Sequence, residues 1–153
     1  MTEQYQVIKG DLFELAPKHT YLAHACNCQG VWGGGVAKEF KKRYPEAFEI
    51  YNQICTGLDT CDVIGTARVL NVDGIIAMFT SIGYGDRKDP PEVILANTEK
   101  ALKDLAGKMP LGCHIASPKI NSGLFGVPWD ETEKLILRML KVRQDMRWTV
   151  YEL

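Results

Sequence analysis

The sequence has no excess of charge of either sign. Its 18 lysines and arginines stand against 19 aspartates and glutamates, so that the formal net charge is -1 at pH 7. A molecule with so small a net charge does not attract nucleic acid or an anionic membrane surface by its overall field. We therefore expect no nucleic-acid partner and no membrane partner, and a bound phosphate would have to be held by local geometry.

Long hydrophobic runs and paired cysteines are missing as well. No stretch approaches the roughly 18 apolar residues of a membrane span, and the first residues lack the pattern of a secretory signal. The five cysteines form no Cys-x-x-Cys pair, which argues against a disulfide framework and a four-cysteine zinc site. Cys26 and Cys28 either hold a soft metal or, more commonly for such residues, fill a core. We expect a cytoplasmic or nuclear protein without a metal or cofactor.

The hydrophobic pattern indicates one α/β domain. Apolar or alternating runs predict strands, and amphipathic runs predict helices between them. Asp73-Gly74 is typical of a two-residue hairpin turn and predicts one antiparallel pair. The result is a mixed sheet with helices on both faces. The predicted strands are 5–9, 21–26, 66–72, 75–79, 114–117 and 148–153, and the predicted helices are 35–44, one from Pro45, 91–107 and 128–143.

Three consecutive glycines, Gly33 to Gly35, lie in a segment that leaves a strand and enters a helix. This segment, residues 24–37, reads HACNCQGVWGGGVA and matches neither a Walker loop nor Gly-x-Gly-x-x-Gly. Glycines remove every Cβ, so that backbone N–H groups can converge on an oxyanion where a helix begins. The alternative is a loop that needs left-handed backbone conformations and binds nothing.

Two further segments join strands to helices. Residues 118–128, PKINSGLFGVP, form either a second anion-binding loop or a plain turn with a hydrophobic anchor. Residues 80–90, TSIGYGDRKDP, mix glycines with charge, as mobile lids do. In folds of this class ligands bind outside the carboxyl ends of strands, and these segments therefore predict a common ligand site.

Four motifs together resemble the macrodomain family: VIKGDL at 7–12, HACN at 24–27, WGGGVA at 32–37 and NSGLFGVPW at 121–129. The resemblance extends over nearly the whole chain, and it is greatest to the branch with ADP-ribose 1″-phosphate phosphatases and terminal ADP-ribose glycohydrolases. It implies one macrodomain over residues 1–153, with a three-layer α/β/α fold, a mixed central sheet and an ADP-ribose cleft along the loop edge.

The resemblance also implies roles for single residues. Asp11 matches the acid that hydrogen-bonds the adenine amino group, with Gly10 and Leu12 beside it, and a helix N-cap is its alternative role. Asn27 matches the polar residue that reaches the distal ribose, and we expect it to take part in catalysis. The other matched binding positions are Trp32, Gly33, Gly34, Gly35, Val36, Asn121, Ser122, Gly123, Leu124, Phe125, Gly126 and Tyr151.

Several of these assignments leave alternatives open. His24 either relays a proton to the reacting water or is a buried imidazole, and Tyr151 either packs against adenine or belongs to the core. Asp130, in the first turn of the predicted last helix, is a candidate base, although acids there also complement the helix dipole. Phe125 stands where the glycohydrolase branch has an aspartate, which argues against that branch's lysine chemistry even though Lys88 lies in the 80–90 segment.

The resemblance therefore implies a phosphatase that converts ADP-ribose 1″-phosphate, a by-product of tRNA splicing, to ADP-ribose and phosphate. The expected partners are these small molecules and, in one alternative, ADP-ribosylated protein. A non-catalytic ADP-ribose-binding module is the second hypothesis. A hydrolase of ADP-ribosylated protein or of O-acetyl-ADP-ribose is the third. We expect a monomer.

Overall fold

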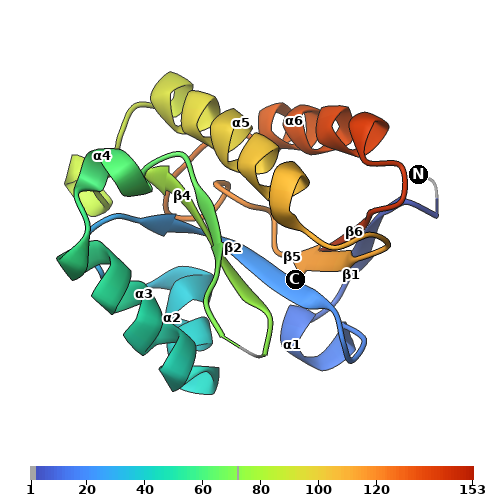
Figure 1. Cartoon of the computed structure of the whole chain (residues 1–153), viewed down its shortest axis with the longest axis horizontal. Helices are drawn as coiled ribbons and strands as arrows, with labels where there is room; N and C mark the ends of the chain where they lie inside the picture. Colours follow the sequence, from blue (N-terminus) through green and yellow to red (C-terminus); the bar gives the residue numbers. More distant parts are fainter. Residues whose placement is uncertain (1–2, 72) are drawn as a thin grey trace.

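A single mixed sheet runs through the molecule (Figure 1). The computed structural model describes residues 3–71 and 73–153. The six strands lie in the order β1-β6-β5-β2-β4-β3, and every neighbouring pair is parallel except β3 and β4. Their bounds are β1 Tyr5–Lys9, β2 Tyr21–Asn27, β3 Ala67–Val69, β4 Ile75–Ser81, β5 His114–Ser117 and β6 Arg147–Glu152.

Helices cover both faces of the sheet, which confirms the predicted three-layer α/β/α class. In Figure 1, α5 and α6 lie on one face, and α1, α2 and α3 lie on the other. The helices are α1 Leu12–Leu15, α2 Gly35–Arg43, α3 Pro45–Gly57, α4 Thr60–Val63, α5 Pro91–Lys108 and α6 Trp129–Val142, with a 3-10 turn, η1, at Gly85–Arg87. Pro45 and Pro91 each occupy the first turn of a helix, where the missing N–H costs no hydrogen bond.

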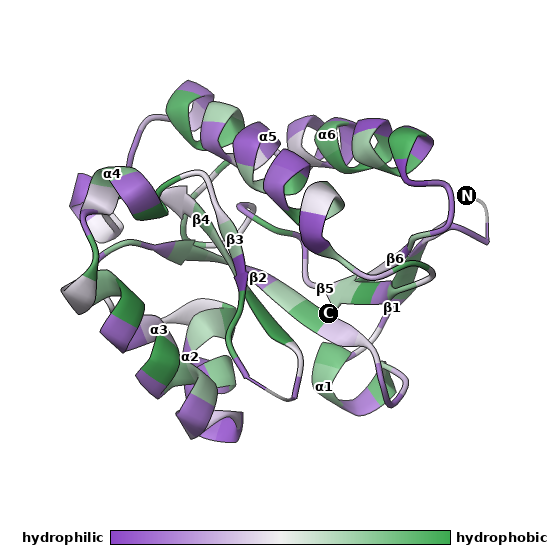
Figure 2. Cartoon of the chain, viewed as in Figure 1, coloured by the Kyte–Doolittle hydropathy of each residue, from purple (hydrophilic) through white to green (hydrophobic). Residues whose placement is uncertain are grey.

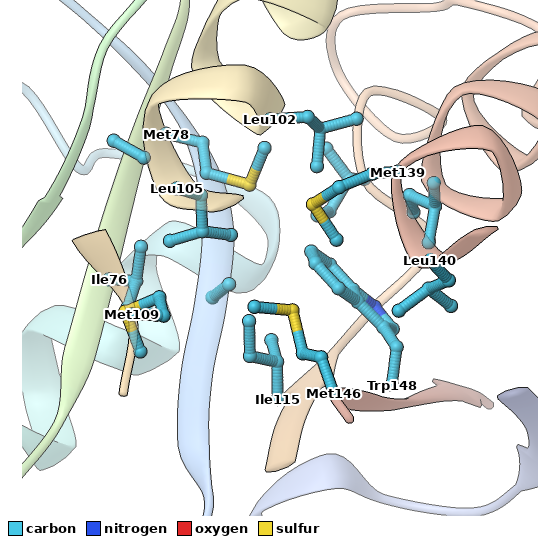
Figure 3. Close-up of a cluster of buried hydrophobic side chains, with 14 of the residues drawn as sticks. Ile76, Met78, Leu102, Leu105, Met109, Ile115, Met139, Leu140, Met146 and Trp148 are labelled. Carbon is cyan, nitrogen blue, oxygen red and sulfur yellow. The ribbon is translucent and has the colours of Figure 1, made fainter. Parts of the chain in front are cut away.

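Each face of the sheet has its own hydrophobic core. Figure 2 shows largely hydrophobic strands beside helices that carry both polar and apolar residues. The core under α5 and α6 is drawn in Figure 3 and includes Ile76, Met78, Leu102, Leu105, Met109, Ile115, Met139, Leu140, Met146 and Trp148. The core under α1, α2 and α3 is aromatic, with Trp32, Phe40, Tyr51 and Phe79. Strand β4 contributes to both cores and is buried along its whole length.

The predicted antiparallel pairing of the hairpin is confirmed, but the predicted two-residue turn is wrong. Strands β3 and β4 are antiparallel, but the N–H of Leu70 donates to the carbonyl of Ile75, so that four residues rather than two make the connection. The amide of Asn71 explains the longer turn, because it accepts from the N–H of Ile75 (3.3 Å) and so competes with strand pairing. Val72, the predicted end of the first strand, lies outside the described residues.

Among the described residues, no helix is both long and apolar enough to cross a membrane.

Candidate binding cleft at the carboxyl edge of the sheet

The carboxyl ends of the five parallel strands meet at one edge of the sheet, and three long loops leave from it. We call residues 28–34, between β2 and α2, the first loop. Residues 118–128, between β5 and α6, are the second loop, and residues 82–90, between β4 and α5, are the third loop. The structure therefore brings together the three segments that the sequence singled out.

The first and second loops touch. A Cβ atom at Gly34 would lie 2.9 Å from Cδ1 of Leu124, and one at Gly35 would lie 3.5 Å from the same atom. Leu124 is 70% exposed, and its side chain lies against glycines that have no side chain of their own. Lys88 of the third loop approaches the second loop, where its Cε lies 4.0 Å from the Cβ position of Gly126. The three loops thus lie close to one another at this edge of the sheet.

Both loops present backbone N–H groups without partners. No hydrogen bond within the described part of the chain uses the N–H groups of Gly33, Gly34 or Gly35, and α2 begins without a side-chain cap. The same holds for the N–H groups of Gly123, Leu124 and Phe125 in the second loop, as judged from the described residues. Free N–H groups at a loop and a helix start are suited to binding phosphate oxygens.

Asn27, the last residue of β2, holds the first loop through side-chain hydrogen bonds. Its Oδ1 accepts the backbone N–H of Gln29 (2.9 Å), and its Nδ2 donates to the carbonyl of Val31 (2.7 Å). The hydroxyl of Tyr51, which reaches up from α3, lies 2.8 Å from both the Oδ1 and the backbone carbonyl of Asn27. Asn27 is only 6% exposed, and most of its polar capacity is therefore used within the chain.

Asn121 fastens the second loop in a similar way. Its Nδ2 donates to the hydroxyls of Thr98 (2.9 Å) and Thr132 (3.3 Å), and its Oδ1 accepts the hydroxyl of Thr80 (2.9 Å). Its carbonyl accepts the N–H of Val127, which closes the loop. The backbone of Asn121 is left-handed (φ 69°), a conformation that asparagine tolerates better than most residues.

Side-chain hydrogen bonds hold the third loop at its base. The hydroxyl of Ser81 donates to the carbonyl of Gly83 (2.8 Å) and accepts the N–H of Asp89 (3.0 Å). The carboxylate of Asp89 accepts the N–H of Ile82 (2.9 Å). The tip, residues 84–88, is exposed and includes Lys88.

Asp11 and its neighbours lie at the carboxyl end of β1. The carboxylate of Asp11 caps α1 by accepting the N–H of Phe13 (2.9 Å), so that its helix-capping role is present, and its second oxygen makes no hydrogen bond among the described residues. The N–H of Gly10 donates to the carbonyl of Glu152 at the end of β6 (2.8 Å). Leu12 and Tyr151 are buried in the aromatic core, and for Tyr151 the structure favours the packing role.

His24 lies inside the aromatic core and is fully buried. Its ring stacks on Phe40 (4.0 Å between centroids), meets Trp32 edge-on (4.6 Å) and has both nitrogens 3.8 Å from the thiol of Cys26. Burial lowers the pKa of His24 to about 3. The ring is therefore neutral at physiological pH, and the structure favours the buried-imidazole alternative over proton relay.

The remaining predicted site residues differ in how far they are exposed to solvent. Trp32 is buried and stacks on Tyr51 (4.8 Å), so that it supports the first loop from within the core. The Oγ of Ser122 is buried without a hydrogen-bond partner among the described residues and could serve a ligand. Val36, Gly126 and Asp130 are exposed, and Phe125 is half-buried.

The two cysteines of β2 and the first loop lie within the core. Cys26 and Cys28 are buried in the aromatic core, and burial raises the pKa of the Cys28 thiol to about 12. The one group of possible metal ligands found in the described parts of the chain is Asp59, Cys61 and Asp62, which are exposed at α4. Exposed acids of this kind do not by themselves define a metal site.

Sequence reasoning missed the residues that hold the loops. Tyr51, Thr98 and Thr132 lie outside the glycine segments in sequence. Thr80 is the first residue of the 80–90 segment, and each of the four resembles an ordinary helix or strand residue. The weak signal was the position of Tyr51 on the apolar face of its helix, where a phenolic hydroxyl needs a partner.

A model of the Macro domain family matches residues 23–136. The chain belongs to this family. Among curated relatives, the ADP-ribose 1″-phosphate phosphatase of Lodderomyces elongisporus is 38% identical and aligns over 89% of this chain and 91% of that protein. The enzyme of the same name from Candida albicans is 37% identical over 86% of this chain and 90% of that protein.

Solved structures agree with this assignment. The macrodomain of Mycobacterium tuberculosis DarG has a TM-score of 0.80 and 27% identity, with 99% of each chain covered. Thermosipho africanus DarTG in complex with ADP-ribose has a TM-score of 0.73 and 18% identity, with 98% of this chain and 42% of that chain covered, and it supports the fold alone.

Proposed function

We propose that the protein is a phosphatase that hydrolyses ADP-ribose 1″-phosphate to ADP-ribose and inorganic phosphate. The relatives that carry this name are 34–38% identical to the chain over most of its length. The structural observation that carries the proposal is the pair of touching loops whose N–H groups have no partner within the described residues. A ligand with several phosphates can be bound there without a net positive charge on the protein.

In the proposed reaction, a water molecule attacks phosphorus and the bond between phosphorus and the 1″ oxygen breaks. The water gives up a proton, the 1″ oxygen gains one, and phosphate leaves. The N–H groups of the two loops stabilise negative charge on the phosphoryl oxygens, and one such donor typically contributes about 3 kcal/mol in a transition state. His24 has no proton-transfer role in this scheme, because it is buried and neutral.

We propose that the carboxylate of Asp130 acts as the general base that takes the proton from the attacking water. It is exposed in the first turn of α6, two residues after the second loop. Glu131, its neighbour in the same turn, pairs with Lys134 (3.6 Å) and is the matched control. We expect Asp130→Asn to lower turnover by about 100-fold, within the usual range for a general base, without changing affinity for ADP-ribose. An equal loss of turnover in Glu131→Gln would show that turnover depends on the negative charge of this helical turn rather than on Asp130 as the base.

The direct test is phosphate release from ADP-ribose 1″-phosphate. Release above a buffer control supports the phosphatase. ADP-ribose binding without release would instead support the non-catalytic module. Parallel assays with ADP-ribosylated protein and O-acetyl-ADP-ribose test the remaining alternative, for which Lys88 beside Gly126 is the relevant observation.

A further inference from the structure

Two buried asparagines lie beneath the cleft, one under each glycine-containing loop, and their hydrogen bonds run into the protein. We infer that Asn27 and Asn121 are positioning residues, and that Tyr51 and Thr98 fix the geometry of the two loops through them. The inference rests on the proposed function in one respect, because it takes these loops to be the ones that hold the phosphates of ADP-ribose.

Both N–H donors of the Asn121 amide are used within the protein, and its side chain is buried. An amide group offers two N–H donors, and both are used, by the hydroxyls of Thr98 and Thr132. Its oxygen accepts the hydroxyl of Thr80. These three threonines come from α5, α6 and β4, so that one side chain ties the second loop to three elements. With both donors used and the side chain buried, Asn121 acts on a ligand chiefly through the backbone that it shapes.

The amide of Asn27 is nearly as fully used. Its oxygen accepts from the N–H of Gln29 and lies 2.8 Å from the hydroxyl of Tyr51, and this arrangement fixes which side of the amide carries nitrogen. One N–H of Nδ2 donates to Val31, and a single N–H remains for a ribose hydroxyl. Loss of the Tyr51 hydroxyl would remove the contact that ties this amide to α3, while its bonds to Gln29 and Val31 remain.

The backbone of β2 explains how Asn27 reaches Tyr51. Strand residues alternate between the two faces of a sheet, and Cys26 already points into the aromatic core. The pairing of β2 with β4 shifts between Cys26 and Asn27, as at a β-bulge. Asn27 consequently faces α3, where Tyr51 lies. The irregular pairing of β2 with β4 thus helps to position the first loop.

The test compares matched hydroxyl deletions near the cleft and at the opposite edge of the sheet. Tyr51→Phe and Thr98→Val remove the hydroxyls that hold the two asparagines. Tyr5→Phe and Thr149→Val are the controls, because both side chains are buried and hydrogen-bonded, to Glu133 (2.5 Å) and His114 (2.8 Å), away from the loops. For each variant we would measure the melting temperature, the Kd for ADP-ribose by calorimetry and the backbone amide exchange of residues 28–34 and 118–128.

We expect all four variants to fold with a lower melting temperature, and only the cleft pair to weaken ADP-ribose binding, by about fivefold. Amide exchange should quicken in residues 28–34 for Tyr51→Phe and in residues 118–128 for Thr98→Val, without ligand. Unchanged exchange, or equal loss of affinity in the controls, overturns the inference. If exchange changes as expected while the wild-type protein does not bind ADP-ribose, the proposed function fails and the positioning role stands.

Discussion

His24 lies three residues before Asn27 on the same strand, and both were plausible catalytic residues in the sequence. Their surroundings separate them. His24 is enclosed by Phe40 and Trp32, whereas Asn27 lies at the base of the first loop with one N–H to spare. Sequence spacing could place both residues at the end of β2, but it could not reveal the shift in pairing that turns Asn27 toward Tyr51. For that reason the anchors of the loops were not predictable from the sequence.

The buried imidazole of His24 makes stability depend on pH. The unfolded chain binds a proton near pH 6.5, while the folded protein does not until about pH 3, so that stability is complete above pH 6.5 and falls as the pH falls. The slope from this one group approaches about 1.4 kcal/mol per pH unit well below pH 6.5. We expect urea unfolding to show lower stability at pH 5 than at pH 7.

The control is His24→Leu, which removes the titrating group and keeps an apolar side chain. Burial and Arg147 also lower the pKa of His114, which contributes in the same direction and remains in this variant. The difference in unfolding free energy between pH 7 and pH 5 should therefore be smaller in His24→Leu, though not zero. An equal difference in both proteins would mean that His24 is not buried as a neutral group in solution.

At the scale of elements, the sequence was most informative where periodicity was long. The predicted helix 91–107 is α5, Pro91–Lys108, and the predicted helix 128–143 is α6, Trp129–Val142. The short α4 and the four-residue hairpin connection were not predicted, and α1 was anticipated only through the capping alternative for Asp11. Side chains such as those of Asp11 and Asn71 decide these short elements locally. The glycines in the sequence identified the site loops, but they did not identify the buried side chains whose hydrogen bonds hold those loops.

Gly34 tests whether the space between the first and second loops is the ligand site. Gly34→Glu would place a carboxylate beside the free N–H groups, where it competes with a phosphate by charge and volume. We expect the Kd for ADP-ribose to rise at least about tenfold by calorimetry, consistent with the loss of charge-assisted hydrogen bonds. Gly34→Ala is the control, since its Cβ meets only the flexible end of Leu124 and should cost much less.

Gly83 tests the fastened base of the third loop. A Cβ atom there would lie 2.2 Å from the backbone oxygen of Arg87, and backbone cannot move aside as a side chain end can. We expect Gly83→Ala to open the loop and to make trypsin cleavage after Arg87 or Lys88 faster. Gly107→Ala, where a Cβ meets nothing within 4 Å, should be cleaved at the wild-type rate. Equal rates in all three proteins would contradict this prediction.

At the scale of the whole molecule, near-zero net charge sets a limit on how the ligand is attracted. The predicted absence of broad electrostatic capture follows from the charge count, while the position of the cleft follows from the parallel strands that end together. Neither property depends on a single residue, which is why both could be predicted from composition and the order of elements.

Salt should consequently have little effect on binding. Hydrogen bonds from backbone N–H groups act at short range and are screened less than interactions between exposed charges. We expect the Kd for ADP-ribose to change less than about threefold between 50 and 200 mM NaCl, unlike systems in which many lysines neutralise phosphates. A loss of tenfold or more would identify side-chain cations, Lys88 first among them, as the main contacts.

Leu124 has a kinetic consequence. It joins the first and second loops through one methyl group that rests against Gly34 and Gly35, and no hydrogen bond among the described residues spans that contact. Rotation of this one exposed side chain, a motion of picoseconds to nanoseconds, would separate the two loops' contact without moving the anchored backbone. Association should then follow the rate of diffusion and encounter, and differences in affinity among ADP-ribose derivatives should arise chiefly from how slowly each one leaves.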